Sequence, residues 1–151
     1  MSEVGGYRRT WIDHTSEVEA PLAAVMTLLA DLDQWSAWIP GLSAVERDRG
    51  KPVQVGTRFT MRVKPAPFHP PLPLRCKIYR LEPSVIEWGG DVLASSVRHR
   101  FELSELSATR TRVHQVEYAT NALALIARIA EPGILRYDLR WQNALGTRLA
   151  A

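Results

Sequence analysis

Between residues 57 and 120, most of the chain alternates apolar and polar side chains with a period of two. The segment VRHRFEL, residues 97–103, places Val, His, Phe and Leu on one side and two Arg and one Glu on the other. Successive side chains of a strand point to opposite faces of its sheet, so this pattern is typical of strands with one buried face. A histidine standing in line with Val, Phe and Leu is the feature that most needs a physical explanation.

Helical periodicity occurs only before and after this region. Apolar residues recur at helical spacing after Pro21, which suits a first helical turn, and a second short helix is expected over 33–39. The helical period returns from Leu123 onward, where Pro132-Gly133 predicts a kink or a break. A stiff proline-rich loop is expected over 64–73, and the expected strands are 10–18, 41–47, 57–63, 74–82, 85–89, 93–104 and 111–120. Runs of strands flanked by helices indicate an α+β fold with an antiparallel sheet.

Length and composition describe a single domain of ordinary globular type. The chain has 151 residues, of which 46% are hydrophobic and 23% charged, with a net charge of +3. The basic residues are spread along the chain, which argues against a nucleic-acid-binding patch. The longest apolar runs are too short to span a membrane, and no signal-peptide pattern precedes the first strand. We therefore expect a cytoplasmic protein without stable membrane insertion, with a flexible tail over 1–9 and one domain over 10–149.

Several kinds of chemistry have no matching motif in the sequence. The four histidines and the single cysteine, Cys76, lack metal-ligand spacing, and one cysteine excludes an internal disulfide. Glycine-rich phosphate loops, nucleophile elbows and zinc-protease motifs are missing as well. Cys76 alternates with Leu74 and Ile78, which predicts an inert buried thiol. We therefore expect no metal, no cofactor and no covalent nucleophile.

A histidine on a buried face needs a polar partner there. If the connection between the last two strands turns about 107–108, the register sets His99 opposite Glu117, with Gln115 as a polar neighbour. Directly opposed side chains are close enough to interact. A slip of one residue would instead bring His114 to the inner face.

Two interpretations of this pair remain open. In the structural one, His99 and Glu117 form a hydrogen-bonded pair that fixes the strand register. In the functional one, Glu117 accepts a hydrogen bond from His99, which presents its other nitrogen to a ligand carbonyl or hydroxyl. A histidine held by a carboxylate can titrate near neutrality, so this arrangement also suits general acid–base chemistry.

The chain resembles the START/Bet v 1-like superfamily, often described as polyketide cyclase/dehydrase and lipid transport proteins. The resemblance begins with VEAPLAAVMTLLADLDQWSAWIP, residues 18–40, and covers roughly 10–149. It continues in order with Gly56-Thr57, Trp88-Gly89, His99-x-Phe101, Thr111 and Glu117. The resemblance implies a helix-grip fold, in which a curved antiparallel sheet, here of about seven strands, wraps a long C-terminal helix. Two short helices follow the first strand, and an apolar cavity lies between sheet and terminal helix.

The same resemblance implies binding of a hydrophobic small molecule of lipid, polyketide or aromatic type in that cavity. One alternative is an enzyme of the polyketide cyclase or dehydratase type, with His99 as the catalytic acid–base oriented by Glu117. Another is a module whose groove receives a peptide or protein. Phe68 and His69, in the proline-rich loop, are placed at the entrance. The residues expected to contact the ligand are Trp38, Phe59, Met61, Ile78, Trp88, His99, Phe101, Gln115, Glu117, Tyr137 and Trp141.

Overall fold

The computed structural model describes residues 8–64, 70–92, 95–120 and 140–151. Several predictions fall outside these residues: the entrance at Phe68 and His69, the kink at Pro132-Gly133, and the ligand contact of Tyr137. The tail predicted over 1–9 lies outside them up to residue 7, and its last two residues belong to a strand instead.

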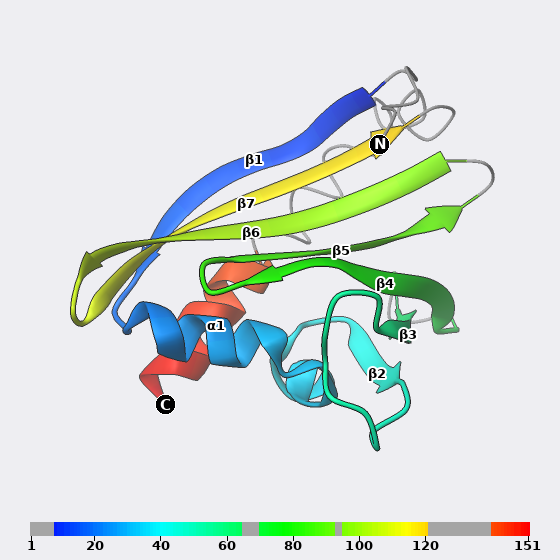
Figure 1. The fold of residues 1–151 in the computed structure, drawn as a ribbon, viewed down its shortest axis with the longest axis horizontal. Coiled ribbons are helices and arrows are strands. Elements are labelled where there is room, and N and C mark those ends of the chain that lie inside the picture. Colours follow the sequence, from blue (N-terminus) through cyan, green and yellow to red (C-terminus); the bar gives the residue numbers. More distant parts are fainter. Residues whose placement is uncertain (1–7, 65–69, 93–94, 121–139) are drawn as a thin grey trace.

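One curved antiparallel sheet of seven strands forms the body of the molecule (Figure 1). In space the strands follow the order β1-β7-β6-β5-β4-β3-β2. This arrangement confirms the predicted α+β class and the antiparallel sheet. The strands are β1 (Arg8–Val18), β2 (Leu42–Glu46), β3 (Arg58–Val63), β4 (Leu72–Glu82), β5 (Val85–Val92), β6 (Ser95–Ser107) and β7 (Arg110–Thr120).

Helices lie on one side of this sheet. Between β1 and β2 come α1 (Leu22–Ala30), the 3-10 turn η1 (Leu32–Gln34) and α2 (Trp35–Trp38), and residues 140–150 are helical. Pro21 precedes the first turn of α1 as its N-cap residue, one position earlier than predicted, and its carbonyl accepts hydrogen bonds from Ala24 and Val25. Figure 1 shows α1 and the C-terminal helix on the same side of the sheet, which we call its inner face.

The strand β4 begins at Leu72, two residues earlier than predicted, and includes a proline. Pro73 pairs with Arg62 of β3, and it lies beyond the β4–β5 ladder, which ends at the Lys77–Gly89 pair. A missing N–H at this position therefore removes no hydrogen bond to β5.

The core fills the space between the inner face and the helices. Alternate residues of β3 to β7 supply one side of it, and α1, α2 and residues 140–150 supply the other. At one end, Arg47 fixes η1 against β2 through two hydrogen bonds to the Asp33 carboxylate, of 3.0 and 2.6 Å. The largest fully buried side chains of the core include Trp35, Trp141, Phe101, Leu29, Leu32, Ile78, Ile86 and Leu145.

Candidate functional site

The register of β6 and β7 confirms the pairing predicted for the inner face. Leu103 lies opposite Val113, Phe101 opposite Gln115, and His99 opposite Glu117. The alternative of a one-residue slip, which would bring His114 inward, is wrong. The His99–Glu117 and Phe101–Gln115 pairs therefore place three polar side chains on the inner face.

A chain of four hydrogen-bonded side chains crosses this face. The Nε2 atoms of His99 and Gln115 are 2.8 Å apart, and Nε2 of Gln142 donates to Oε1 of Gln115 at 2.7 Å. The hydroxyl of Ser16 donates to Oε1 of Gln142. His99, Gln115 and Gln142 are all buried. The chain thus connects β6, β7, the C-terminal helix and β1 through uncharged groups.

The direction of this chain fixes the tautomer of the imidazole. Because Oε1 of Gln115 already accepts from Gln142, its Nε2 must donate to His99. The Nε2 of His99 is then the acceptor, and its proton resides on Nδ1. An imidazole held in this way presents one N–H donor and no charge.

Burial keeps His99 neutral. The desolvation of the charged imidazolium lowers the pKa of His99 from 6.5 to about 3. Two details of the predicted site are therefore wrong: the hydrogen bond of His99 goes to Gln115 and not to Glu117, and the imidazole does not titrate near neutrality. The neutral amide of Gln115 cannot stabilise the imidazolium as a carboxylate would.

Aromatic rings surround the imidazole. The centroid of His99 lies 4.5 Å from that of Trp88, 5.1 Å from Phe101 and 5.3 Å from Trp141. Trp88 also contacts Trp35 at 4.8 Å and stacks on Trp141 at 5.6 Å with an interplanar angle of 22°. These contacts form a continuous aromatic cluster between the sheet and the helices.

The structure brings most of the predicted ligand-contact residues into or beside this cluster. Trp38 contacts Trp141 at 6.0 Å, and Phe59 contacts Trp35 at 5.8 Å. Glu117 is half-buried, next to His99 in the row. The predicted residues that share one buried apolar core are Trp38, Phe59, Met61, Ile78, Trp88, Phe101 and Trp141.

An open hollow of about 460 Å³ lies where β1 meets the C-terminal helix. Its lining includes Ser16 and Gln142, the last two members of the hydrogen-bonded chain, together with His14. The chain therefore runs from the wall of a solvent-facing hollow to an imidazole inside the aromatic cluster.

Sequence reasoning missed this end of the site. Ser16 and His14 lie on β1, whose alternation the sequence does not show clearly, and Gln142 adjoins Trp141 on the terminal helix. The one sequence signal for Gln142 was its position next to Trp141, which was predicted to contact the ligand. No sequence pattern relates residues so far apart as Ser16 and Gln142.

Two further findings concern the described part of the chain only. It contains no helix long and apolar enough to cross a membrane. It also contains no group of three or more His, Cys, Asp or Glu side chains arranged to hold a metal ion.

Solved structures with the same fold include several ligand-binding and catalytic proteins. The Zhui aromatase/cyclase from Streptomyces sp. R1128 superimposes with a TM-score of 0.78 at 20% identity, covering 95% of this chain and 94% of that one. A START superfamily protein from Mycobacterium smegmatis gives a TM-score of 0.73 at 15% identity, with coverages of 92% and 96%. A norcoclaurine synthase point mutant from Thalictrum flavum gives 0.72 at 14% identity, with 98% of both chains covered. At these identities the likeness shows a shared fold.

Sequence comparison is more specific. No curated protein matches the sequence. The model of the family described as polyketide cyclase / dehydrase and lipid transport, however, matches residues 9–140. That match covers most of the chain and includes β1 to β7 almost entirely. The chain belongs to the polyketide cyclase/dehydrase and lipid transport family.

Proposed function

We propose that the protein binds a hydrophobic small molecule of aromatic or polyketide type between the inner face of the sheet and the C-terminal helix. The observation that carries this proposal is the neutral imidazole of His99, set among aromatic rings and held by the Gln115 amide. A structural histidine needs only a hydrogen bond. This one is embedded in a four-membered chain that fixes its tautomer and leaves Nδ1–H as its donor.

The chemistry of this environment defines the ligand. The aromatic rings around His99 favour a flat apolar ligand, since burial of apolar surface contributes roughly 25 cal/mol per Å². A single N–H donor in such surroundings selects a carbonyl or hydroxyl oxygen, because a buried donor without an acceptor costs free energy. Neutral His99 does not require a charged ligand. A polycyclic compound carrying a ring carbonyl meets all three conditions.

Tryptophan fluorescence provides the test, because Trp88, Trp141 and Trp35 lie in the cluster. We expect saturable quenching by a hydroxyanthraquinone. Replacing His99 with Phe retains an aromatic ring but removes the N–H donor, and it should weaken anthraquinone binding about tenfold, the value of one buried hydrogen bond. Binding of anthracene, which has no oxygen, should stay within about twofold of wild type for the same reason.

The matched control is His114→Phe, which changes a histidine on the outer face of the neighbouring strand and should leave both affinities unchanged. Circular dichroism would establish that each variant is folded. If neither probe binds the wild type, or if His99→Phe weakens both probes equally, the proposed site is wrong.

Cyclase or dehydratase activity is the second candidate, and the family description supports it. In this reading the Nδ1–H of His99 would donate a hydrogen bond to a substrate oxygen that gains negative charge, because the neutral ring is a weak base. His99→Ala separates the two candidates. Turnover of a polyketide-like substrate lost with binding retained would favour catalysis, whereas loss of both together would favour recognition alone.

A further inference from the structure

The outer face of the sheet carries an unusual row of positive charge. Arg58 of β3 lies opposite Lys77 of β4, Lys77 opposite Gly89 of β5, and Gly89 opposite Arg98 of β6. Three of the four positions in this row are basic and none is acidic. Like charges directly opposite one another in a sheet destabilise it, so such a row needs an explanation.

The neighbouring row shows the ordinary arrangement. There Arg80, Glu87 and Arg100 alternate in charge across β4, β5 and β6. Arg100 contacts Glu87 at 3.6 Å and Glu102 at 2.8 Å, and Arg80 contacts Glu82 at 2.9 Å. Charges on this face are therefore generally compensated, and the row through Lys77 is an exception.

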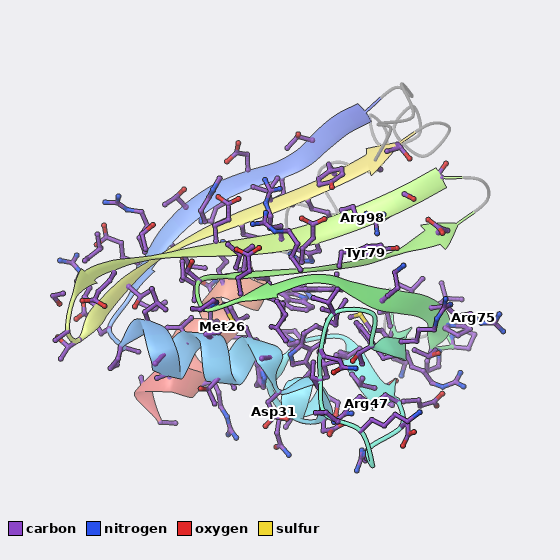
Figure 2. The ribbon with its side chains drawn as sticks, in the orientation of Figure 1. Met26, Asp31, Arg47, Arg75, Tyr79 and Arg98 are labelled. Carbon is purple, nitrogen blue, oxygen red and sulfur yellow. The ribbon has the colours of Figure 1, made fainter. Side chains whose placement is uncertain are left out.

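Two basic side chains of this row also lie over one ring, that of Tyr79, which occupies the register irregularity between Ile78 and Arg80 of β4. The guanidinium carbon of Arg98 lies 3.2 Å from the centroid of Tyr79, and Nζ of Lys77 lies 4.7 Å from it. Figure 2 shows Arg98 and Tyr79 close together, with Arg75 farther along β4. Among the described residues, Arg58, Arg75, Lys77 and Arg98 have no acidic partner within ion-pair distance.

A hollow of about 400 Å³ lies over this row. Its lining includes Arg58, Thr60, Arg75, Lys77, Tyr79 and Gly89. Two carboxylates also border it, and both have partners: Glu46 accepts from Arg62 at 2.6 Å, and Asp91 accepts from the Ser96 hydroxyl. Arg62 neutralises Glu46, whereas the Ser96 hydroxyl leaves the charge of Asp91 in place. The hollow thus presents three cations against one carboxylate without a basic partner in the described part of the chain, together with a hydroxyl donor and a phenol. A concave surface with an excess of one charge sign focuses the electrostatic field on an ion of opposite sign.

We infer that this outer hollow is a second ligand site, which binds a phosphoryl group. Two exposed guanidinium forks and an ammonium group match the several oxygens and the double charge of a phosphate monoester. A carboxylate ligand would satisfy only part of this donor set. The phosphoryl group belongs either to a soluble phosphoester or to a phospholipid headgroup. The site is separate from the inner face, so it does not depend on the proposed function.

Pyrophosphate binding, measured by isothermal titration calorimetry at constant ionic strength, tests the inference. We expect saturable binding to the wild type. The double variant Arg58→Gln/Arg75→Gln should bind at least about tenfold more weakly, because it loses two charge-assisted contacts. The control Arg140→Gln/Arg148→Gln removes the same charge from exposed positions on the C-terminal helix and should stay within about twofold.

Vesicles distinguish the two sources of the phosphoryl group. Retention by phosphatidic acid–phosphatidylcholine vesicles but not by phosphatidylcholine alone, lost in Arg58→Gln/Arg75→Gln and competed by pyrophosphate, identifies a lipid headgroup. Pyrophosphate binding without vesicle retention identifies a soluble phosphoester. No saturable pyrophosphate binding, or equal weakening in the control variant, would overturn the inference, because long-range attraction to net charge would then explain the data.

Discussion

His99 should make the stability of this protein fall as the pH is lowered from neutrality. In the unfolded chain its pKa is about 6.5, whereas burial lowers its pKa to about 3 in the folded state. Between these values the unfolded state binds a proton that the folded state does not. The contribution of His99 to the free energy of unfolding is therefore fully present above pH 6.5 and is lost as the pH falls toward 3. Integrating this difference from pH 7 to pH 4.5 gives a loss of about 2.5 kcal/mol from this one group.

Urea unfolding across this pH range, for wild type and His99→Phe, isolates the contribution of the imidazole. Carboxylates titrate equally in both proteins and cancel in the difference. The variant should be the less stable protein at pH 7, because the Gln115 amide loses its acceptor. Only the wild type then loses a further amount of about 2.5 kcal/mol between pH 7 and pH 4.5, so the stability difference between the two proteins should shift by that amount in favour of the variant. A difference independent of pH would show that His99 is accessible to solvent, and the argument for a neutral buried donor would fail.

His114 offers a control of opposite sign. Hydrogen bonds from the ring nitrogens to Asp13 and Glu102, at 2.7 and 3.3 Å, raise the pKa of this half-exposed histidine. A raised pKa stabilises the fold at low pH, and this contribution disappears as the pH rises through the folded-state pKa. His114→Gln should therefore be destabilising at pH 5 and neutral at pH 8. Solvent screening keeps its effect at about 0.5 kcal/mol or less.

Two further predictions concern Gly89 and Cys76, which lie on neighbouring parts of the sheet. Gly89→Ala should destabilise the protein by about 3 kcal/mol or more in urea unfolding, because a Cβ there would lie 1.9 Å from the Val97 carbonyl oxygen. A loss below about 1 kcal/mol, the average cost of a point substitution, would contradict this. Burial raises the pKa of Cys76 to about 12, so maleimide should label the native thiol about a thousandfold more slowly than a free cysteine. Labelling at the free-cysteine rate in the absence of denaturant would contradict the second expectation.

The strands were predictable because each of them buries one face only. The alternation in VRHRFEL and its neighbour fixed both the inner face and the pairing of His99 with Glu117. Errors occurred at the strand ends, where local composition and pairing disagree. At Pro73, the nearby prolines predict a loop. The residue nevertheless belongs to β4, because it has a neighbouring strand on one side only, where it pairs with Arg62, and a proline is tolerated in such an edge position.

The partner of His99 was less predictable than its position. Glu117 and Gln115 both share the inner face with it, and sequence gives no distance between side-chain atoms. The choice depends on Gln142, which reaches the site from a helix that is distant in sequence and orients the Gln115 amide. The outer hollow was equally inaccessible, because its cations are separated along the chain and meet only through the pairing of β3, β4, β5 and β6.

The use of two amides explains how the hydrogen-bonded chain from His99 to Ser16 remains both polar and uncharged. A carboxylate at position 115 would stabilise the imidazolium, raise the pKa of His99 and place an ion pair inside the aromatic cluster, where desolvation is costly. An amide with both its ends bonded cannot do this, yet it still fixes which imidazole nitrogen carries the proton. Gln115→Glu should therefore raise the pKa of His99 toward neutrality in NMR titrations, and a pKa that stays near 3 would show that burial alone controls it.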